Sequence, residues 1–275
     1  MPNKNLEELI ALTGAARIYD LAFELFPGVP HFPAHPPFVF GLTKRHGEVV
    51  TELADGRLAS SSAESIATGT HVGTHLDGLG HFSCNGMLFG GASAAGQSYA
   101  TGLETLGVET VAPVLRRGVL LDIAALKDVS CLASDVTITP EDLKAAAVRQ
   151  NVKIGAGDVV LLRTGWAQHW PDPAAYLMAG KGNVPTSPGP GLEAARWLSA
   201  QGIFATGSDT IVYEKVPSAL PAHVHLLVES GIHIIEVLNL EELARDAVSE
   251  FLFVALPLKI RGATGSPVRP LAMVV

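Results

Sequence analysis

Short apolar runs alternate with amphipathic segments through the second half of the chain. Buried strands are predicted where such runs are bounded by turn residues, at 118–123, 159–163, 203–206, 232–237 and 251–260. Helices are predicted between them at 139–149, 190–201, 223–230 and 240–247. Strand–helix–strand order repeated in this way predicts an α/β fold with a mixed sheet that is at least partly parallel.

Helix boundaries are marked by specific residues. Thr139 is a predicted N-cap, Pro140 stands at the first helical position, and Asp142 completes a cap-like box with Thr139. Gly202 and Gly231 follow the two later helices as stop signals.

The first 40 residues follow a different pattern. Residues 6–25 carry Leu, Ala and Ile at helical spacing, which predicts a helix ending before Pro27. Residues 28–38 hold four prolines and are predicted to be an extended arm. Such an arm is expected to leave the body and pack elsewhere, for example on a second subunit. No linker is visible, so residues 1–275 are expected to form a single domain.

Composition excludes several classes of function. The formal net charge is −8, and no basic run is longer than Arg116-Arg117, which argues against nucleic-acid binding and a membrane-surface role. The longest apolar run, 251–258, is far shorter than the ~20 residues of a membrane span. The N-terminus lacks the charged and then apolar pattern of a secretory signal peptide, and two cysteines are too few for a disulfide framework. A cytoplasmic protein is the expectation.

A cluster of histidines stands between 71 and 81. It contains His71, His75, Asp77 and His81, and imidazole with carboxylate is a ligand set for Zn²⁺, Mn²⁺ or Fe²⁺. In a straight strand, His71 and His75 would lie ~13 Å apart, too far to share an ion. The interspersed glycines favour a tight turn that brings them together. Asp77 can then close the site, and His81 lies nearby, where it can orient a ligand or transfer a proton.

Glu236 is a carboxylate within an apolar predicted strand, and a buried carboxylate needs a partner. A metal or a histidine would supply one, and His223 lies upstream. Two simpler interpretations stay open: the histidines are ordinary loop residues, or they bind a metal without catalysis.

The stretch from His71 to Phe82 resembles the H-x-G-T-H-x-D-x-x-x-H-F signature of the cyclase family, which contains bacterial kynurenine formamidases and isatin hydrolases. The resemblance extends over most of the chain. It departs at 78–80, Gly-Leu-Gly, where many members have a proline.

The resemblance implies a swivelling β/β/α fold and assembly as a homodimer or homotetramer. Ligands of a first metal would be His71, His75 and Asp77, with His81 as the proton-transfer residue. Asp77, His223 and Glu236 could hold a second metal. One or two Zn²⁺ or Mn²⁺ ions per subunit are therefore expected.

The chemistry that follows is hydrolysis of a small linear or cyclic amide. A bound metal would lower the pKa of water towards ~7 and polarise the carbonyl, while His81 moves the proton. Lactone hydrolysis, cyclisation and metal binding without catalysis are the alternatives. Candidate substrate-binding residues are Phe38, Phe82, Trp166 and Asp209; the alternative role for the aromatic residues is core packing, and for Asp209 a turn or the orientation of a ligand histidine.

Overall fold

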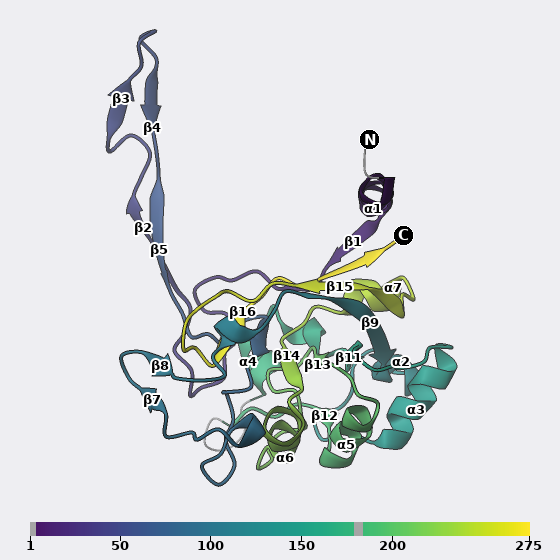
Figure 1. The fold of residues 1–275 in the computed structure, drawn as a ribbon. Helices are drawn as coiled ribbons and strands as arrows, with labels where there is room; N and C mark the ends of the chain where they lie inside the picture. Colours follow the sequence, from purple (N-terminus) through teal and green to yellow (C-terminus); the bar gives the residue numbers. More distant parts are fainter. Residues whose placement is uncertain (1–3, 179–183) are drawn as a thin grey trace.

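The computed structural model describes residues 4–178 and 184–275, and its centre is one curled, nine-stranded mixed sheet (Figure 1). The strands follow the order β1-β17-β15-β9-β11-β13-β14-β6-β16. Their bounds are β1 Arg17–Asp20, β17 Leu271–Val274, β15 Glu250–Ala255, β9 Val114–Asp122, β11 Val159–Arg163, β13 Ala205–Ser208, β14 His233–Glu236, β6 His75–Asp77 and β16 Gly265–Pro267. The prediction of an α/β fold with a mixed sheet is confirmed.

Four central strands, β9, β11, β13 and β14, are parallel, and the strands outside them pair antiparallel. Strand β11 is buried at every position. Val160 and Leu162 face one apolar cluster, whereas Val159 and Leu161 face another. Burial on both faces explains why its sequence is a continuous apolar run.

Helices cover the two faces unequally. The larger layer packs on the Val160 face and the smaller α7 lies near the other cluster. The helices are α1 Lys4–Ala15, α2 Ile123–Leu126, α3 Pro140–Arg149, α4 Pro173–Leu177, α5 Leu192–Ala200, α6 Pro221–His223 and α7 Glu241–Arg245, with a π-helix, η4, at Val224–Ser230 and short 3₁₀ turns at Phe89–Gly91, Val108–Thr110 and Trp166–His169. The predicted capping box between Thr139 and Asp142 is present. None of the helices in these ranges has the length and apolar character needed to cross a bilayer.

The prediction of one helix over 6–25 is wrong beyond Ala15. The chain leaves α1 and forms β1, which pairs antiparallel with β17 at the edge of the sheet. Sheet pairing with a strand more than 250 residues away overrides the local helical spacing. Helix α1 itself has no buried residue.

Residues 28–38 lie against the body rather than leaving it. Outside an isolated bridge between His31 and Val72 they form no strand, and Val29 and Phe38 are buried in a core cluster. The segment that projects from the body is the next one, 39–67, a long two-stranded ribbon (Figure 1). Its strands are β2 Val39–Lys44 with β5 Ala63–Ala67, and β3 Val50–Glu52 with β4 Leu58–Ser60; the remaining short strands are β7 Gln97–Ser98 with β8 Gly102–Leu103, and β10 Thr137–Ile138 with β12 Gly189–Pro190.

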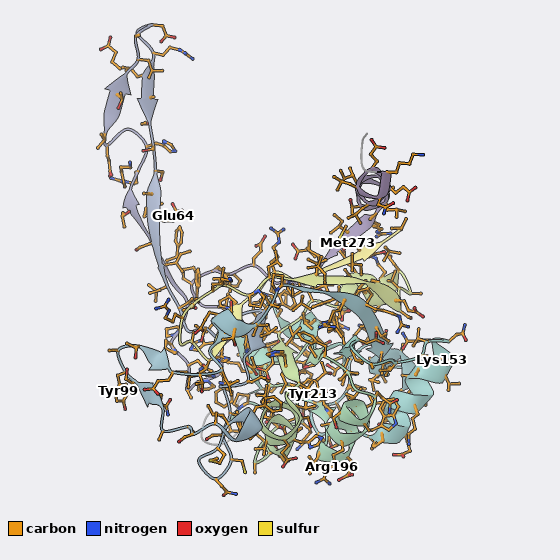
Figure 2. All side chains as sticks on the ribbon, in the orientation of Figure 1. Glu64, Tyr99, Lys153, Arg196, Tyr213 and Met273 are labelled. Atoms are coloured by element: carbon orange, nitrogen blue, oxygen red, sulfur yellow. The ribbon has the colours of Figure 1, made fainter. Side chains whose placement is uncertain are left out.

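Side chains on the ribbon contact few neighbours. Figure 2 shows Glu64 on this ribbon, away from the packed body in which Tyr213 is buried. Large apolar side chains on the ribbon are also exposed, among them Phe40, Leu42 and Leu58. None of the residues 39–67 belongs to a core cluster of the chain.

Candidate metal centre

The turn before β6 brings His71 and His75 together. Gly73 adopts a φ of +66°, and a Cβ at this position would lie 2.4 Å from Leu25 Cδ2. The backbone bends here, and the two imidazole centroids lie 5.2 Å apart. The expected tight turn is confirmed, and glycine is required at its centre both by conformation and by space.

Strand β6 lies between β14 and β16. The register of these pairings places the polar side chains of β6 and β14 next to one another. His75 pairs with Glu236 on β14, while Asp77 pairs with Gly265 on β16. His75 and Asp77 are two residues apart, so their side chains project from the same face of the strand. Glu236 projects beside them because directly paired residues are close neighbours.

His71 is held by a contact on each ring nitrogen. Its Nδ1 lies 2.7 Å from Asp77 Oδ1, and its Nε2 lies 2.8 Å from Thr264 Oγ1. Gly265 leaves room for the ring, since a Cβ there would lie 2.4 Å from His71 Cε1. The orientation of His71 is thus fixed by residues almost 200 positions away.

His75 is fixed in one tautomer. Its Nδ1–H donates to the Gly73 carbonyl at 2.8 Å, so Nε2 of the neutral ring carries a lone pair. That nitrogen lies 3.5 Å from Asp77 Oδ1 and 3.4 Å from Glu236 Oε2. Burial lowers the pKa of His75, but the carboxylates outweigh it and raise the pKa overall. A lone pair facing two carboxylate oxygens creates a place for a cation.

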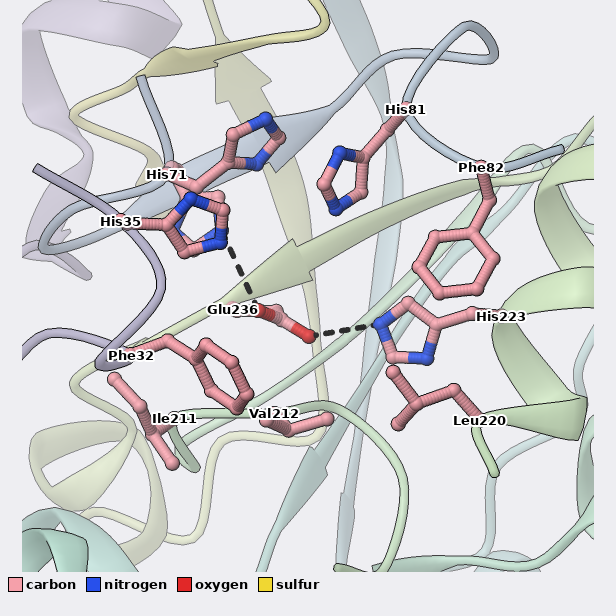
Figure 3. Close-up of a pocket in the computed structure, with 11 residues that line it drawn as sticks. Phe32, His35, His71, His81, Phe82, Ile211, Val212, Leu220, His223 and Glu236 are labelled. Atoms are coloured by element: carbon pink, nitrogen blue, oxygen red, sulfur yellow. Dashed lines mark hydrogen bonds and ion pairs between the residues drawn. The ribbon is translucent and has the colours of Figure 1, made fainter. Parts of the chain in front are cut away.

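Glu236 points towards His223 (Figure 3), and its other carboxylate oxygen lies 3.4 Å from His75 Nε2. Its Oε1 accepts a hydrogen bond from the Tyr213 backbone N–H at 2.6 Å and lies 3.2 Å from His223 Nε2. Glu214, which is also buried, accepts from His223 Nδ1 at 2.8 Å and from its backbone N–H at 2.9 Å. Burial opposes protonation of His223, yet both carboxylates raise its pKa to about 10. A carboxylate behind an imidazole in this way orients the ring towards a metal.

Asp77 belongs to both of the groups of donor atoms that could hold a metal, one with His71 and His81 and the other with His75 and Glu236. Its Oδ2 is buried and has no hydrogen-bond partner within the described ranges. Burial raises the pKa of Asp77, but His81, His71 and His75 outweigh it and hold the pKa well below the usual range. Donor atoms of His71, Asp77 and His81 lie within 4.8 Å of one another, as do those of His75, Asp77 and Glu236. The orphaned anionic oxygen and the nitrogen–oxygen donors fit a divalent metal.

His81 stands at the edge of this centre. Its ring stacks on His71 with centroids 3.9 Å apart, and no side-chain hydrogen bond to it is found in residues 4–178 or 184–275. Burial, only partly opposed by Asp77, lowers the pKa of His81 to about 4. The ring is therefore neutral near pH 7 and can accept a proton.

These groups open into a cavity of about 140 Å³ (Figure 3). Three of the clustered histidines form one side of it together with His223 and Glu236, and the remaining wall is apolar apart from His35. The lining residues are Phe32, His35, His71, His75, His81, Phe82, Ile211, Val212, Leu220, His223 and Glu236. A small, flat organic molecule would therefore contact apolar walls while one end reaches the polar centre.

The structure brings together seven of the residues that the sequence singles out: His71, His75, Asp77, His81, Phe82, His223 and Glu236. Phe38 and Trp166 are not among the cavity residues, because both are buried in the core cluster beside it. Asp209 is also outside the cavity and fully buried. Substrate contact by these three residues gains no support.

Four residues with evident roles at the centre were missed: Phe32, His35, Glu214 and Thr264. The sequence around Glu214 and Thr264 gives no indication of a role at this site, because single acidic or hydroxyl residues are common in loops. His35 lies in the proline-rich segment. The prolines there indicate an extended backbone, but they do not indicate which way the His35 side chain points. Burial and the nearby imidazoles of His71 and His75 lower the pKa of His35.

Asp209→Ala is expected to lower the free energy of unfolding by roughly 2–4 kcal/mol, because buried donors would lose their acceptor. The Asp209 carboxylate accepts from the backbone N–H and Oγ1 of Thr164 and from the backbone N–H of Gly165. Burial raises the pKa of Asp209 to about 6 despite these bonds. Urea denaturation measures the loss, with Asp135→Ala at an exposed position as the control. Equal stability of the two variants would contradict a role of Asp209 in holding the backbone at Thr164 and Gly165.

Known proteins are similar to this chain in fold and in sequence. Over 272 residues the chain is 29% identical to an isatin hydrolase of Roseibium aggregatum, covering 96% of this chain and 94% of that protein. The crystal structure of a protein described as a novel cyclase superposes with a TM-score of 0.84 at 29% identity, over 99% of this chain and 93% of that chain. An isatin hydrolase bound to the product analogue thioisatinate gives a TM-score of 0.75 at 25% identity, over 100% and 99% of the two chains.

The match to a family of proteins covers most of the chain. Residues 19–215 match the model of the family described as "Putative cyclase", and they include the turn, β6 and three of the four parallel strands, β9, β11 and β13. The chain therefore belongs to this cyclase family.

Proposed function

We propose that this chain is a metal-dependent hydrolase that cleaves the C–N bond of a small linear or cyclic amide. The observation that carries the proposal is Asp77, whose buried Oδ2 has no partner within the described ranges although histidine nitrogens surround the residue. The similarity to proteins named isatin hydrolases supports an amide of the arylformamide or isatin type.

His71, His75 and Asp77 would hold the first metal, and Asp77, His223 and Glu236 would hold a second one. Imidazole and carboxylate donors suit Zn²⁺ and Mn²⁺. A divalent metal bound here supplies water of lowered pKa and an electrophile for the amide carbonyl.

His81 moves the proton in this proposal. Its neutral ring accepts a proton as water adds to the carbonyl carbon, and it then donates that proton to the nitrogen as the C–N bond breaks. Phe82 lies beside His81 with ring centroids 5.5 Å apart, and it forms part of the wall that excludes bulk water from the reacting atoms. Phe82 is thus the aromatic residue that we propose for substrate contact.

Metal removal is expected to abolish amide hydrolysis, and added Zn²⁺ or Mn²⁺ is expected to restore it. Elemental analysis of the purified protein should find one or two equivalents of metal per chain. Turnover of an arylformamide, a cyclic amide and a lactone is measured before chelation, after chelation and after reconstitution.

Three outcomes of this experiment are distinct. If only the lactone is turned over, the proposed activity becomes lactone hydrolysis in place of amide hydrolysis. Bound metal without turnover of any substrate would favour a non-catalytic metal-binding protein. Activity that survives complete metal removal would contradict the proposal as a whole.

We also propose that the chain assembles as a homodimer or homotetramer. The ribbon 39–67 and helix α1 expose apolar side chains that the body of the chain does not cover, including Phe40, Leu42, Leu9 and Ile10. Light scattering after size-exclusion chromatography is expected to give two or four times the 28.8 kDa chain mass. A monomer at micromolar concentration would contradict assembly.

A further inference from the structure

His35 stands in the cavity wall on a segment that is not part of the sheet. The imidazole is half-buried and stacks on His71 with centroids 5.1 Å apart, while His81 lies 6.3 Å away (Figure 3). It thus lies at the mouth of the same centre and comes from a part of the chain that supplies none of the proposed metal ligands.

The backbone around His35 holds the ring in place. Its own N–H donates to the Phe32 carbonyl at 2.9 Å, which closes a turn. The next residue, Pro36, accepts from the Gly69 N–H at 3.2 Å. Phe38 is buried in the core cluster beyond them. These contacts anchor the segment, so His35 is part of a built wall.

The ring of His35 has no side-chain hydrogen-bond partner in residues 4–178 and 184–275. By contrast, His71, His75 and His223 each have ring nitrogens engaged by neighbouring groups. The rest of the wall away from the metal centre is apolar, with Phe32 and Ile211 among its residues. A half-buried polar ring without a protein partner, in an otherwise apolar wall, is placed to pair with a ligand.

We propose that His35 is a substrate-binding residue whose ring N–H donates a hydrogen bond to a second acceptor atom of the substrate, near the scissile amide. The inference rests on the proposed amide hydrolysis and adds to it a residue that determines specificity. His35 would discriminate among aromatic amides by the position of a further carbonyl or similar acceptor relative to the scissile bond. Phe32, with its ring 5.8 Å from that of His35, covers the aromatic part.

The test uses four matched probes: N-phenylformamide and its ortho-, meta- and para-acetyl derivatives. Their dissociation constants are measured by calorimetry on metal-loaded protein carrying His81→Ala, so that turnover does not consume the ligand. In this background one acetyl isomer is expected to bind about tenfold more tightly than N-phenylformamide, the gain of one well-placed hydrogen bond.

His35→Leu is expected to abolish that tenfold preference, and His35→Asn, which keeps a donor, to restore part of it. His46→Leu on the projecting ribbon is the matched control and should keep the preference. Metal content is measured in every variant, because His35 contacts the proposed ligand His71.

Two results would overturn the role of His35. One is a binding preference that survives when His35→Leu is added to the His81→Ala protein. The other is that the His81→Ala protein binds all four probes equally or binds none of them. Failure of the proposed function looks different. In that case the protein without His81→Ala would hydrolyse none of the probes, while the His35-dependent preference in binding would remain measurable.

Discussion

Asp77→Asn is expected to leave a folded protein that retains little metal and turns over amide at least ~10³-fold more slowly. Asp77 is the carboxylate shared by both donor groups, so its loss removes a ligand from each. A metal contributes several kcal/mol of charge stabilisation, and each 1.4 kcal/mol corresponds to about tenfold in rate. Elemental analysis and initial rates on the same preparation measure the two losses together.

Asp55→Asn on the projecting ribbon is a suitable control, because this carboxylate is exposed and pairs with Arg57 on the same ribbon. It should bind metal and turn over substrate as the parent protein does. Thermal melting in the presence of chelator separates loss of metal from loss of fold. Full metal content together with normal turnover in Asp77→Asn would be incompatible with the proposed centre.

His81→Ala is expected to keep the metal content unchanged and to lower kcat by roughly 10²–10⁴-fold, the usual contribution of a positioned acid–base group. In the proposed mechanism the unprotonated ring is the base, and burial lowers its pKa to about 4. Rates of the parent protein should therefore fall as the pH decreases towards about 4, where the ring becomes charged. This acid limb of the pH–rate profile should be missing from the residual activity of His81→Ala.

His81 donor atoms also lie near His71 and Asp77, so a role as metal ligand is the competing assignment. The two roles predict different metal contents. Loss of metal in His81→Ala would make the residue a ligand, whereas loss of turnover with metal retained supports proton transfer. His46→Ala is the control, because it removes an imidazole from the exposed ribbon and should leave metal content and turnover unchanged.

Elements with strong local signals could be predicted from the sequence. The capping box at Thr139 fixes the start of α3, and the apolar run at Val159–Arg163 corresponds to β11. The N-terminal helix was predicted too long because β1 exists only through its pairing with β17. No local pattern in the first 25 residues contains information about the last five.

The same distinction applies to the centre. His71, His75 and His81 lie within eleven residues, and the glycines between them indicate a tight turn that brings His71 and His75 together. Glu236 was recognisable as a carboxylate in an apolar strand. An aromatic residue such as Trp166, however, fits a core or a cavity equally well by sequence, and its neighbours in the folded chain decide between them.

The position of β6 in the sheet affects how the protein must fold. The strand that carries His75 and Asp77 pairs on one side with β14 and on the other with β16, from the C-terminal part of the chain. The contact between His71 and Thr264 alone spans 193 residues. Closing so long a loop costs entropy before any contact forms, and such non-local pairing is slow. Glu236 therefore joins His75 and Asp77 late, so in a chain still emerging from the ribosome the proposed metal centre stays incomplete until β14 has been made.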